Sequence, residues 1–393
     1  MKAATTIIRI IVGLLFIFSG LVKANDPLGL SYKMQEYFEI WSLMQFNSAT
    51  LALSVILNAF EIIAGSALLL GWRIRFFSWL LLIIILFFTF LTGYTYVTGN
   101  PKNCGCFGDC LVISSKVSFL KDVALALLIA FLFWNRINIK PLFPRKAGNI
   151  SMLVVILFSF GLQWYTLTHL PIVDCLPYKK GNDINEKMKM PANAIPDSTV
   201  ITFVYMKDGK EIEFTADKFP SDFNADTYKF VKRYDKLVRK GKNNEPPIKG
   251  FVLSGVTGID STQIVLSHPY SVLLFCEDFS KPVYKWKDEF EKIYSQAKVK
   301  NIPAYLITAR MEQAKKALSG TKFADLPVFT CDYTAIRTAA RTNPCLYLLK
   351  EGTVLGKWSD KEMDEGVSQL EDIPTQRLLL PEPPGVPIDT TQQ

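Results

Sequence analysis

Three thiols lie close together in residues 103–110, which read Asn-Cys-Gly-Cys-Phe-Gly-Asp-Cys. Cys104 and Cys106 are separated by one residue, so a disulfide between them would close a small, strained ring that is easier to reduce than a relaxed structural disulfide. Gly105 suits such a ring because glycine tolerates positive φ and adds no side chain. The spacing favours an electron-carrying pair; a metal site and a structural disulfide to a distant cysteine are the alternatives.

Long apolar segments lie on both sides of this stretch. Five of them come close to the ~20 residues that a helix needs to cross the hydrocarbon core of a bilayer. They cover residues 5–22, 48–70, 76–97, 117–134 and 150–170. Because the thiols lie between the third and fourth segments, we expect a multi-pass bundle that holds them at a membrane surface.

Basic residues gather in the connectors on one side of these segments. Arg73 and Arg75 lie between the second and third segments, and residues 135–149 hold four further basic side chains. The positive-inside rule puts these connectors and the N-terminus in the cytoplasm of a bacterium, and everything after residue 170 in the periplasm. All seven cysteines then face an oxidising compartment, where disulfides persist: Cys104, Cys106, Cys110, Cys175, Cys276, Cys331 and Cys345.

Two polar residues interrupt the second apolar segment. Asn58 and Glu61 are three residues apart and therefore share a helix face. A carboxylate is costly inside a membrane, so Glu61 should face the bundle interior and either bind a polar partner or stay protonated. Two roles stay open: linking helices, or handling protons beside a membrane quinone.

Four stretches of the membrane half are distinctive: residues 9–23, 26–29, 61–65 and 103–109. Together they resemble the DoxX/MauE group of redox-associated membrane proteins, over about residues 5–135. The resemblance implies a four-helix membrane domain, here followed by a fifth helix, and periplasmic thiol redox chemistry; the MauE branch is associated with maturation of the disulfide-rich small subunit of methylamine dehydrogenase. Cys104 and Cys106 match the family's paired cysteines, whereas Cys110 stands where a small residue without a thiol is expected.

The chain becomes polar after residue 170. Cys175 follows the fifth segment closely enough to meet the cysteine stretch, either as a resolving partner or in a structural disulfide that pins the soluble part to the bundle. Residues 179–196 have the composition of a linker. Asp208-Gly209, flanked by strand-like residues, predicts a hairpin, and residues 226–240 are expected to form a helix.

Residues 248–375 alternate between strand and helix patterns, which predicts an α/β sheet. Strands are expected at 251–254, 262–266, 271–276, 304–307, 326–331, 346–349 and 354–358, and helices at 281–297, 311–318 and 333–341. This order resembles the thioredoxin-like fold in its peroxiredoxin and thiol-disulfide reductase variants, with Pro344 as the expected cis-proline. Residues 277–282 carry no Cys-X-X-Cys motif, which argues against independent thioredoxin catalysis.

Three further cysteines are expected at one edge of this sheet. Cys276 and Cys331 end strands, and Cys345 follows Pro344. Cys276 and Cys345 would be the favoured pair because their strands would be antiparallel neighbours. A redox pair, a structural disulfide and inert buried thiols all stay open.

The sequence therefore predicts a multidomain protein: a DoxX/MauE-like membrane domain (1–135), a cytoplasmic loop and fifth helix (136–170), a periplasmic linker with hairpin and helix (171–247), a thioredoxin-like domain (248–375) and a disordered proline-rich tail (376–393). We expect a thiol-disulfide redox protein that contacts the lipid bilayer and a periplasmic protein client and passes electrons to or from a membrane quinone. The alternative is a noncatalytic membrane-anchored assembly or chaperone-like module with structural disulfides. Despite the net charge of +8, neither a nucleic-acid motif nor a metal-binding signature is recognisable.

Overall fold

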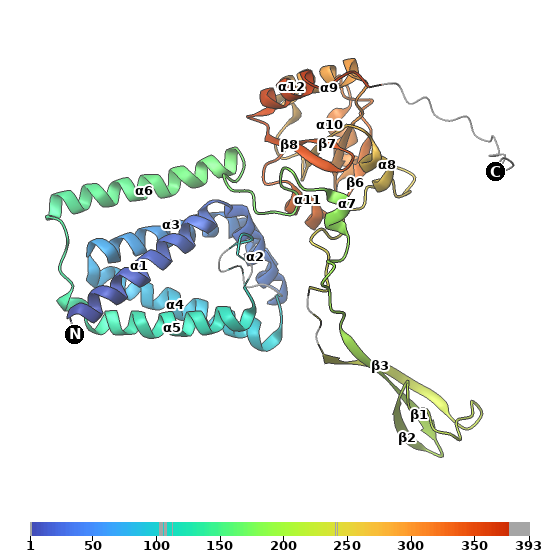
Figure 1. Ribbon diagram of the computed structural model, residues 1–393, viewed down its shortest axis with the longest axis horizontal. Helices are drawn as coiled ribbons and strands as arrows, with labels where there is room; N and C mark the ends of the chain where they lie inside the picture. Colours follow the sequence, from blue (N-terminus) through green and yellow to red (C-terminus); the bar gives the residue numbers. More distant parts are fainter. Residues whose placement is uncertain are drawn as a thin grey trace.

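The computed structural model describes residues 2–101, 105, 108–111, 113–239, 241 and 243–376. These residues form three parts, shown in Figure 1: a helical bundle, a three-stranded arm and an α/β unit. The predicted tail (376–393) lies outside the described residues, apart from Gln376.

Five long helices make up the bundle: α1 (Lys2–Ala24), α3 (Thr50–Leu70), α4 (Ile74–Thr98), α5 (Ser115–Trp134) and α6 (Arg145–Thr168). Each is long and apolar enough to cross a membrane, as predicted. Large apolar side chains such as Leu127 (69% exposed) and Val154 (61%) point outward, where lipid would cover them. The chain is therefore a multi-pass membrane protein in contact with the bilayer.

Glycines allow α1 and α3 to approach closely. A Cβ atom on Gly65 would lie 2.6 Å from the backbone oxygen of Gly13, and one on Gly20 would lie 2.7 Å from Ile62. Small residues are typical of such membrane helix contacts, because dispersion and not water exclusion holds the helices together. α4 packs against α5, and α6 lies along α3 on the outside of the bundle (Figure 1).

The two ends of the bundle differ. The basic end carries the N-terminus, the Arg73 turn and the connector between α5 and α6. The other end, which we call the docking end, carries α2 (Pro27–Ile40), the loop between α4 and α5, and the α/β unit (Figure 1). α2 was not expected, because residues 23–47 have mixed charge and no span-length apolar run. It begins at Asp26, whose side chain accepts a hydrogen bond from the Gly29 N–H at 3.0 Å.

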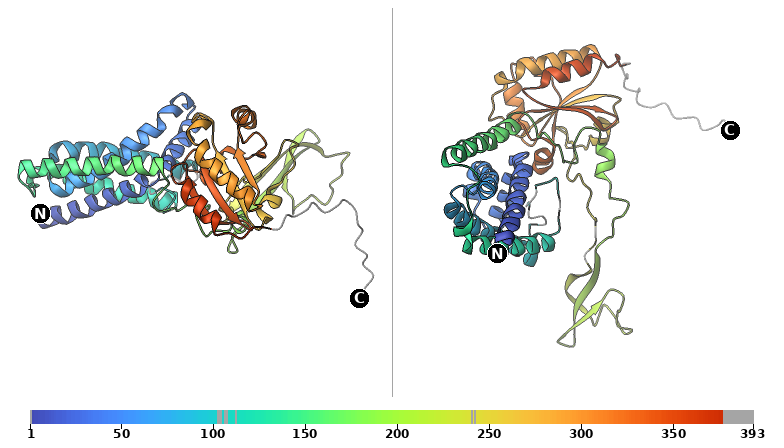
Figure 2. Two further views of the ribbon diagram at one scale, coloured as in Figure 1. Left: turned by 90° about the horizontal axis from the view of Figure 1, so that it is seen from above. Right: turned by 60° about the vertical axis from the view of Figure 1, so that its left-hand side comes forward.

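The arm is an antiparallel sheet in the order β2-β1-β3, formed by β1 (Ser198–Lys207), β2 (Lys210–Thr215) and β3 (Lys229–Arg239). The predicted hairpin is confirmed, with positive φ at Asp208 and Gly209. The predicted helix at 226–240 is wrong, because β3 pairs along β1 and its Phe230 ring packs on Tyr205. The arm projects away from the bundle and the α/β unit (Figure 2).

The α/β unit is built on a five-stranded sheet in the order β6-β5-β4-β7-β8. β4 (Ser271–Cys276), β5 (Ala304–Thr308) and β6 (Val328–Thr330) are parallel, whereas β7 (Cys345–Lys350) and β8 (Thr353–Ser359) run antiparallel to their neighbours. α9 (Lys287–Val299), α10 (Met311–Leu318) and α12 (Met363–Glu371) cover one face. α7 (Ile184–Met188), α8 (Thr262–Ser267) and α11 (Tyr333–Ala339) cover the other.

Most strands and helices of this unit lie where the sequence predicts them, with three corrections. Residues 262–266 form α8 and not a strand: the Asp260 carboxylate accepts a hydrogen bond from the Thr262 N–H at 2.9 Å just before the helix, and Val265 and Leu266 pack into the core from one helix face. Residues 251–254 contribute only isolated bridges at Ser254. The supposed linker contains α7, which is held on β8 because the Ile184 N–H donates to the Gly352 oxygen at 2.9 Å.

Candidate functional site

The predicted cysteine pair, Cys104 and Cys106, lies outside the described residues. Gly105 between them is described, with a φ of 69°. A Cβ atom at this position would lie 3.0 Å from Cγ of Lys33 on α2. Gly105 therefore packs on α2 at the docking end, in a backbone conformation that favours glycine.

A disulfide joins Cys110, in the loop between α4 and α5, to Cys175, in the segment after α6. The sequence marks Cys110 only as a possible secondary redox or structural disulfide cysteine and leaves two roles open for Cys175; the structure makes the two residues partners. The bond ties the start of the soluble part to the bundle. Both residues are only half-buried, so a thiolate in solution can approach the sulfurs.

Cys175 lines a cleft of about 690 Å³ between α2 and α11, which we call the junction cleft. Its wall also includes Tyr32, Gln35, Lys179, Arg337 and Arg341. Nearby positive charge stabilises a thiolate, which makes a cysteine both a better nucleophile and a better leaving group. The cleft thus holds a disulfide in a polar, solvent-connected setting whose wall carries both basic and acidic side chains.

One guanidinium fixes the parts of the docking end to one another. Arg341 is 4% exposed; its Nε donates to both oxygens of Asp26 at 3.0 and 2.8 Å, and its Nη2 donates to Oδ2 of Asp109 at 2.9 Å. Burial alone would lower the pKa of Arg341, but the two carboxylates raise it above its usual value, so the side chain stays charged. Arg341 therefore connects the start of α2 and the loop beside Cys110 to the α/β unit.

A second polar cluster lies beside it, around Glu277 at the end of β4. Oε1 of Glu277 accepts hydrogen bonds from Nε of Arg337 and the hydroxyl of Tyr333, both at 2.8 Å. Arg337 also donates to Gln35 on α2 at 2.7 Å and lies over the ring of Tyr32. Burial, with the Glu277 charge, raises the pKa of Tyr32, so its hydroxyl stays protonated. Glu277, the first residue of the stretch without a Cys-X-X-Cys motif, is thus tied to α2, because the Tyr32 hydroxyl also donates a hydrogen bond to it at 3.3 Å.

The three cysteines of the α/β unit are free and buried. β4 and β7 are antiparallel neighbours as expected, but Cys345 is opposite Phe275 and not Cys276. Since successive strand residues point to opposite faces, Cys276 packs on the α9 side and Cys345 on the α11 side. The favoured Cys276–Cys345 disulfide is therefore absent.

These buried thiols are expected to resist alkylation in the folded protein at pH 8. Burial raises the pKa of Cys331 to about 12 and that of Cys345 to about 11, and it also raises the pKa of Cys276, so almost no thiolate forms. Because the folded protein holds these thiols protonated, they contribute to the free energy of unfolding at pH values below the ordinary thiol pKa. This contribution is lost as the pH rises through 11–12. Peptide mapping after iodoacetamide treatment should find the three labelled only in denaturant. Rapid native labelling of any of them would contradict the assignment.

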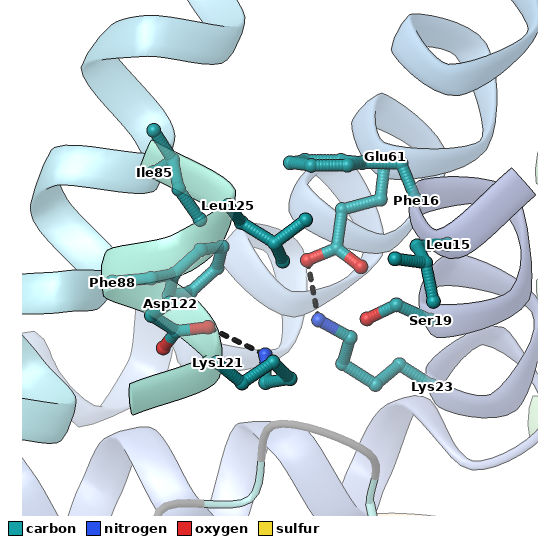
Figure 3. Close-up of a pocket in the computed structure, with 10 residues that line it drawn as sticks. All are labelled: Leu15, Phe16, Ser19, Lys23, Glu61, Ile85, Phe88, Lys121, Asp122 and Leu125. Atoms are coloured by element: carbon teal, nitrogen blue, oxygen red, sulfur yellow. Dashed lines mark hydrogen bonds and ion pairs between the residues drawn. The ribbon is translucent and has the colours of Figure 1, made fainter. Parts of the chain in front are cut away.

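The bundle holds a buried ion pair between Lys23 and Glu61 (Figure 3). Glu61 is 2% exposed and faces the interior, as expected from the free-energy cost of exposing a carboxylate to lipid. Lys23, at the end of α1, was not recognised as its partner, because the sequence places it at the start of a polar connector. Asn58 donates to the Lys23 carbonyl and to Gln163 of α6, both at 3.2 Å.

A small cavity of about 40 Å³ adjoins this pair (Figure 3). Across it, the Asp122 carboxylate binds Lys121 at 2.5 Å and accepts a hydrogen bond from Thr92 at 3.0 Å. Oε2 of Glu61 is buried without a hydrogen-bond partner among the described residues. The cavity is large enough for a water molecule and lies between two pairs of opposite charges.

These features define a multi-pass membrane protein with an α/β unit docked at one end of the bundle. Residues 1–135 match the family described as Methylamine utilisation protein MauE, which confirms the MauE part of the expected resemblance. Residues 193–240, which include the arm, match a domain of unknown function, DUF8463. Neither a curated protein nor a solved structure matches the chain.

Proposed function

We propose that this protein is a membrane-embedded thiol-disulfide oxidoreductase in which Cys104 and Cys106 exchange electrons with the Cys110–Cys175 disulfide. The observation that carries the proposal is the position of that disulfide: it shares a loop with the pair, and Cys175 lines the junction cleft. Residues 1–135 match the MauE family, and the thiol redox chemistry implied by the resemblance to the DoxX/MauE group is of the same class. Methylamine metabolism is not part of the proposal.

The exchange is a reversible two-electron step. A thiolate of the Cys104/Cys106 pair attacks one sulfur of Cys110–Cys175, which breaks that bond and releases the other sulfur as a thiolate. The second thiol of the pair then loses its proton and attacks the mixed disulfide. The pair becomes oxidised, and Cys110 and Cys175 become the dithiol that a client disulfide can oxidise again. In the opposite direction, client thiols pass two electrons to the pair.

A bilayer quinone is the proposed electron acceptor for the oxidising direction. Each quinone takes two electrons and two protons from two thiols, which leaves one disulfide and one quinol. We place the docking end in the periplasm, because basic side chains gather at the opposite end and a disulfide persists at this one. After mild reduction, a membrane-impermeant maleimide should label Cys175 in intact cells, but not a cysteine introduced by Lys146→Cys. The reverse pattern would contradict the orientation.

The α/β unit is proposed to be thioredoxin-like and to act as a binding surface. Its support is the strand order, in which the three parallel strands β6, β5 and β4 are followed across the sheet by the antiparallel β7 and β8. Glu277 takes the place of the redox motif and is tied to α2, and the three thiols are buried. The unit would therefore present clients to the junction cleft and not carry electrons itself.

A noncatalytic assembly module is the second candidate, in which Cys110–Cys175 is only a staple. The inert thiols of the α/β unit favour it. Trapping distinguishes the two: if Cys104→Ser and Cys106→Ser are made singly, one of them should accumulate a mixed disulfide to Cys110 or Cys175 in a non-reducing peptide map. Cys331→Ser is the matched control and should leave the map unchanged. A Cys110–Cys175 bond that persists in both variants under mild dithiol would support the staple.

A further inference from the structure

A third cavity, a groove of about 420 Å³, lies between α2, α3 and α4 on the outside of the bundle, where lipid would be. Its walls are almost entirely apolar and include Phe38 and Trp41 of α2, Leu57 of α3, and Ile84 of α4. The lining residues of α4 run from Leu80 to Thr92, which is about 18 Å of helix at 1.5 Å per residue. The groove is therefore long and narrow, with the dimensions of an extended hydrocarbon chain within one leaflet.

Polar groups line the part of the groove nearest the docking end. Lys23, Lys33 and Thr92 contribute to the wall there, together with Gly105 from the loop after α4. The Lys23 ammonium lies 5.2 Å from the centre of the Phe88 ring, and Phe88 lines both this groove and the small cavity beside Glu61. Hydrogen-bond donors thus reach the apolar groove at one position, and a buried carboxylate lies directly behind them.

We propose that this groove is the binding site of a membrane quinone, with the isoprenoid tail along α3 and α4 and the ring beside Lys23. This inference rests on the proposed redox function. A neutral ring with two carbonyl acceptors matches a site where a cation is already neutralised by Glu61 and aromatic side chains form the walls. A phospholipid headgroup would instead bring a further charge to this buried position.

The electron and proton balance assigns roles to the residues at the ring end. Two thiols give two electrons to the ring, two S–H bonds break, one S–S bond and two O–H bonds form, and quinol leaves. Lys23 donates a hydrogen bond to the ring oxygen that gains negative charge, and Glu61 holds the ammonium in place. Lys23 is a binding residue in this scheme, and Glu61 is a positioning residue.

Photolabelling tests the site without relying on turnover. An azido derivative of decylubiquinone, added to the full-length protein in nanodiscs and irradiated, should label peptides from α2 and α4. Leu57→Trp fills the groove and should weaken binding of decylubiquinone by about tenfold or more. Leu127→Trp, on the lipid-facing side of α5 (Leu127 is 69% exposed), is the matched control and should bind normally. Labelling confined to other helices, or equal binding by both variants, would overturn the proposal.

Two further comparisons separate this inference from the thiol chemistry. A variant with serine at both Cys104 and Cys106 should bind decylubiquinone within about twofold of wild type, so the groove can be right even if the redox proposal fails. Replacing the ion pair by Lys23→Met with Glu61→Gln should weaken quinone binding while leaving that of decylbenzene, which lacks carbonyls, unchanged. Equal loss of both ligands would overturn the placement of the ring, and displacement of the quinone by phospholipid at equal concentration would overturn the assignment of the groove.

Discussion

Glu61→Leu should destabilise the bundle by about 3–5 kcal/mol, the usual cost of removing one partner of a buried ion pair. The side chains of Lys23 and Glu61 are each 3% exposed, so the substitution leaves an ammonium without its carboxylate inside the helices. The midpoint of unfolding in mixed micelles of dodecyl sulfate and a mild detergent measures the change. Helix content should be lost at a much lower dodecyl sulfate fraction than in wild type.

The double variant Lys23→Met with Glu61→Leu is the decisive comparison. It removes both charges, and apolar replacement of a buried pair is often neutral or stabilising, so most of the lost stability should return. Glu36→Leu is the matched control, because Glu36 is half-exposed and its ion pair with Lys33 is on the surface; its effect should stay below about 1 kcal/mol. If the double variant were as unstable as the single one, the pair would not be the reason for the loss.

Arg341→Met should release the α/β unit from the bundle and cost about 2–3 kcal/mol. Removing one partner of a buried pair costs about 3–5 kcal/mol, and the cost is lower here because Asp26 and Asp109 are 13% and 40% exposed and can be solvated once the arginine is gone. Limited proteolysis within residues 170–180 measures the release, because this segment leads from α6 into the soluble part. Cleavage should accelerate in the variant, most strongly after Cys110–Cys175 is reduced.

Arg310→Met provides the control for this experiment, since Arg310 is an exposed arginine of the same unit. It should leave both the cleavage rate and the melting temperature close to wild type. Asp109→Asn should have a smaller effect than Arg341→Met, because Asp26 still pairs with the guanidinium. Unchanged proteolysis in Arg341→Met would show that the disulfide and the remaining contacts are sufficient for docking.

Much of the architecture follows from local sequence patterns. The five long helices were predictable because each is a run of apolar residues with a length that only a membrane requires. The central strands of the α/β unit were predictable for a similar reason: β4 is apolar from Val272 to Cys276 and is followed by the charged residues Glu277 and Asp278. The interior position of Glu61 followed from the cost of a charge in lipid.

The remaining features depend on contacts between distant residues. α2 is short and mixed in charge, and it is held through Asp26 by Arg341, which is 315 positions away in the chain. β3 looks helical in isolation and becomes a strand because β1 offers it an edge. Lys23 could not be assigned to Glu61 without knowing that α1 packs on α3. The partner of Cys175 was open for the same reason, since three thiols lie within reach in the sequence.

A redox titration of the thiols in native membranes tests the central claim most directly. The membranes are equilibrated with dithiol buffers of increasing strength, quenched with an alkylating reagent, and the state of each cysteine is read by mass spectrometry. We expect the Cys104/Cys106 pair to change state under mild reduction. We also expect serine at both positions to slow reduction of Cys110–Cys175 by about tenfold or more, because the direct exchange route is lost. If Cys110–Cys175 is reduced at the same rate with and without the pair, the two do not exchange electrons and the proposed function is wrong.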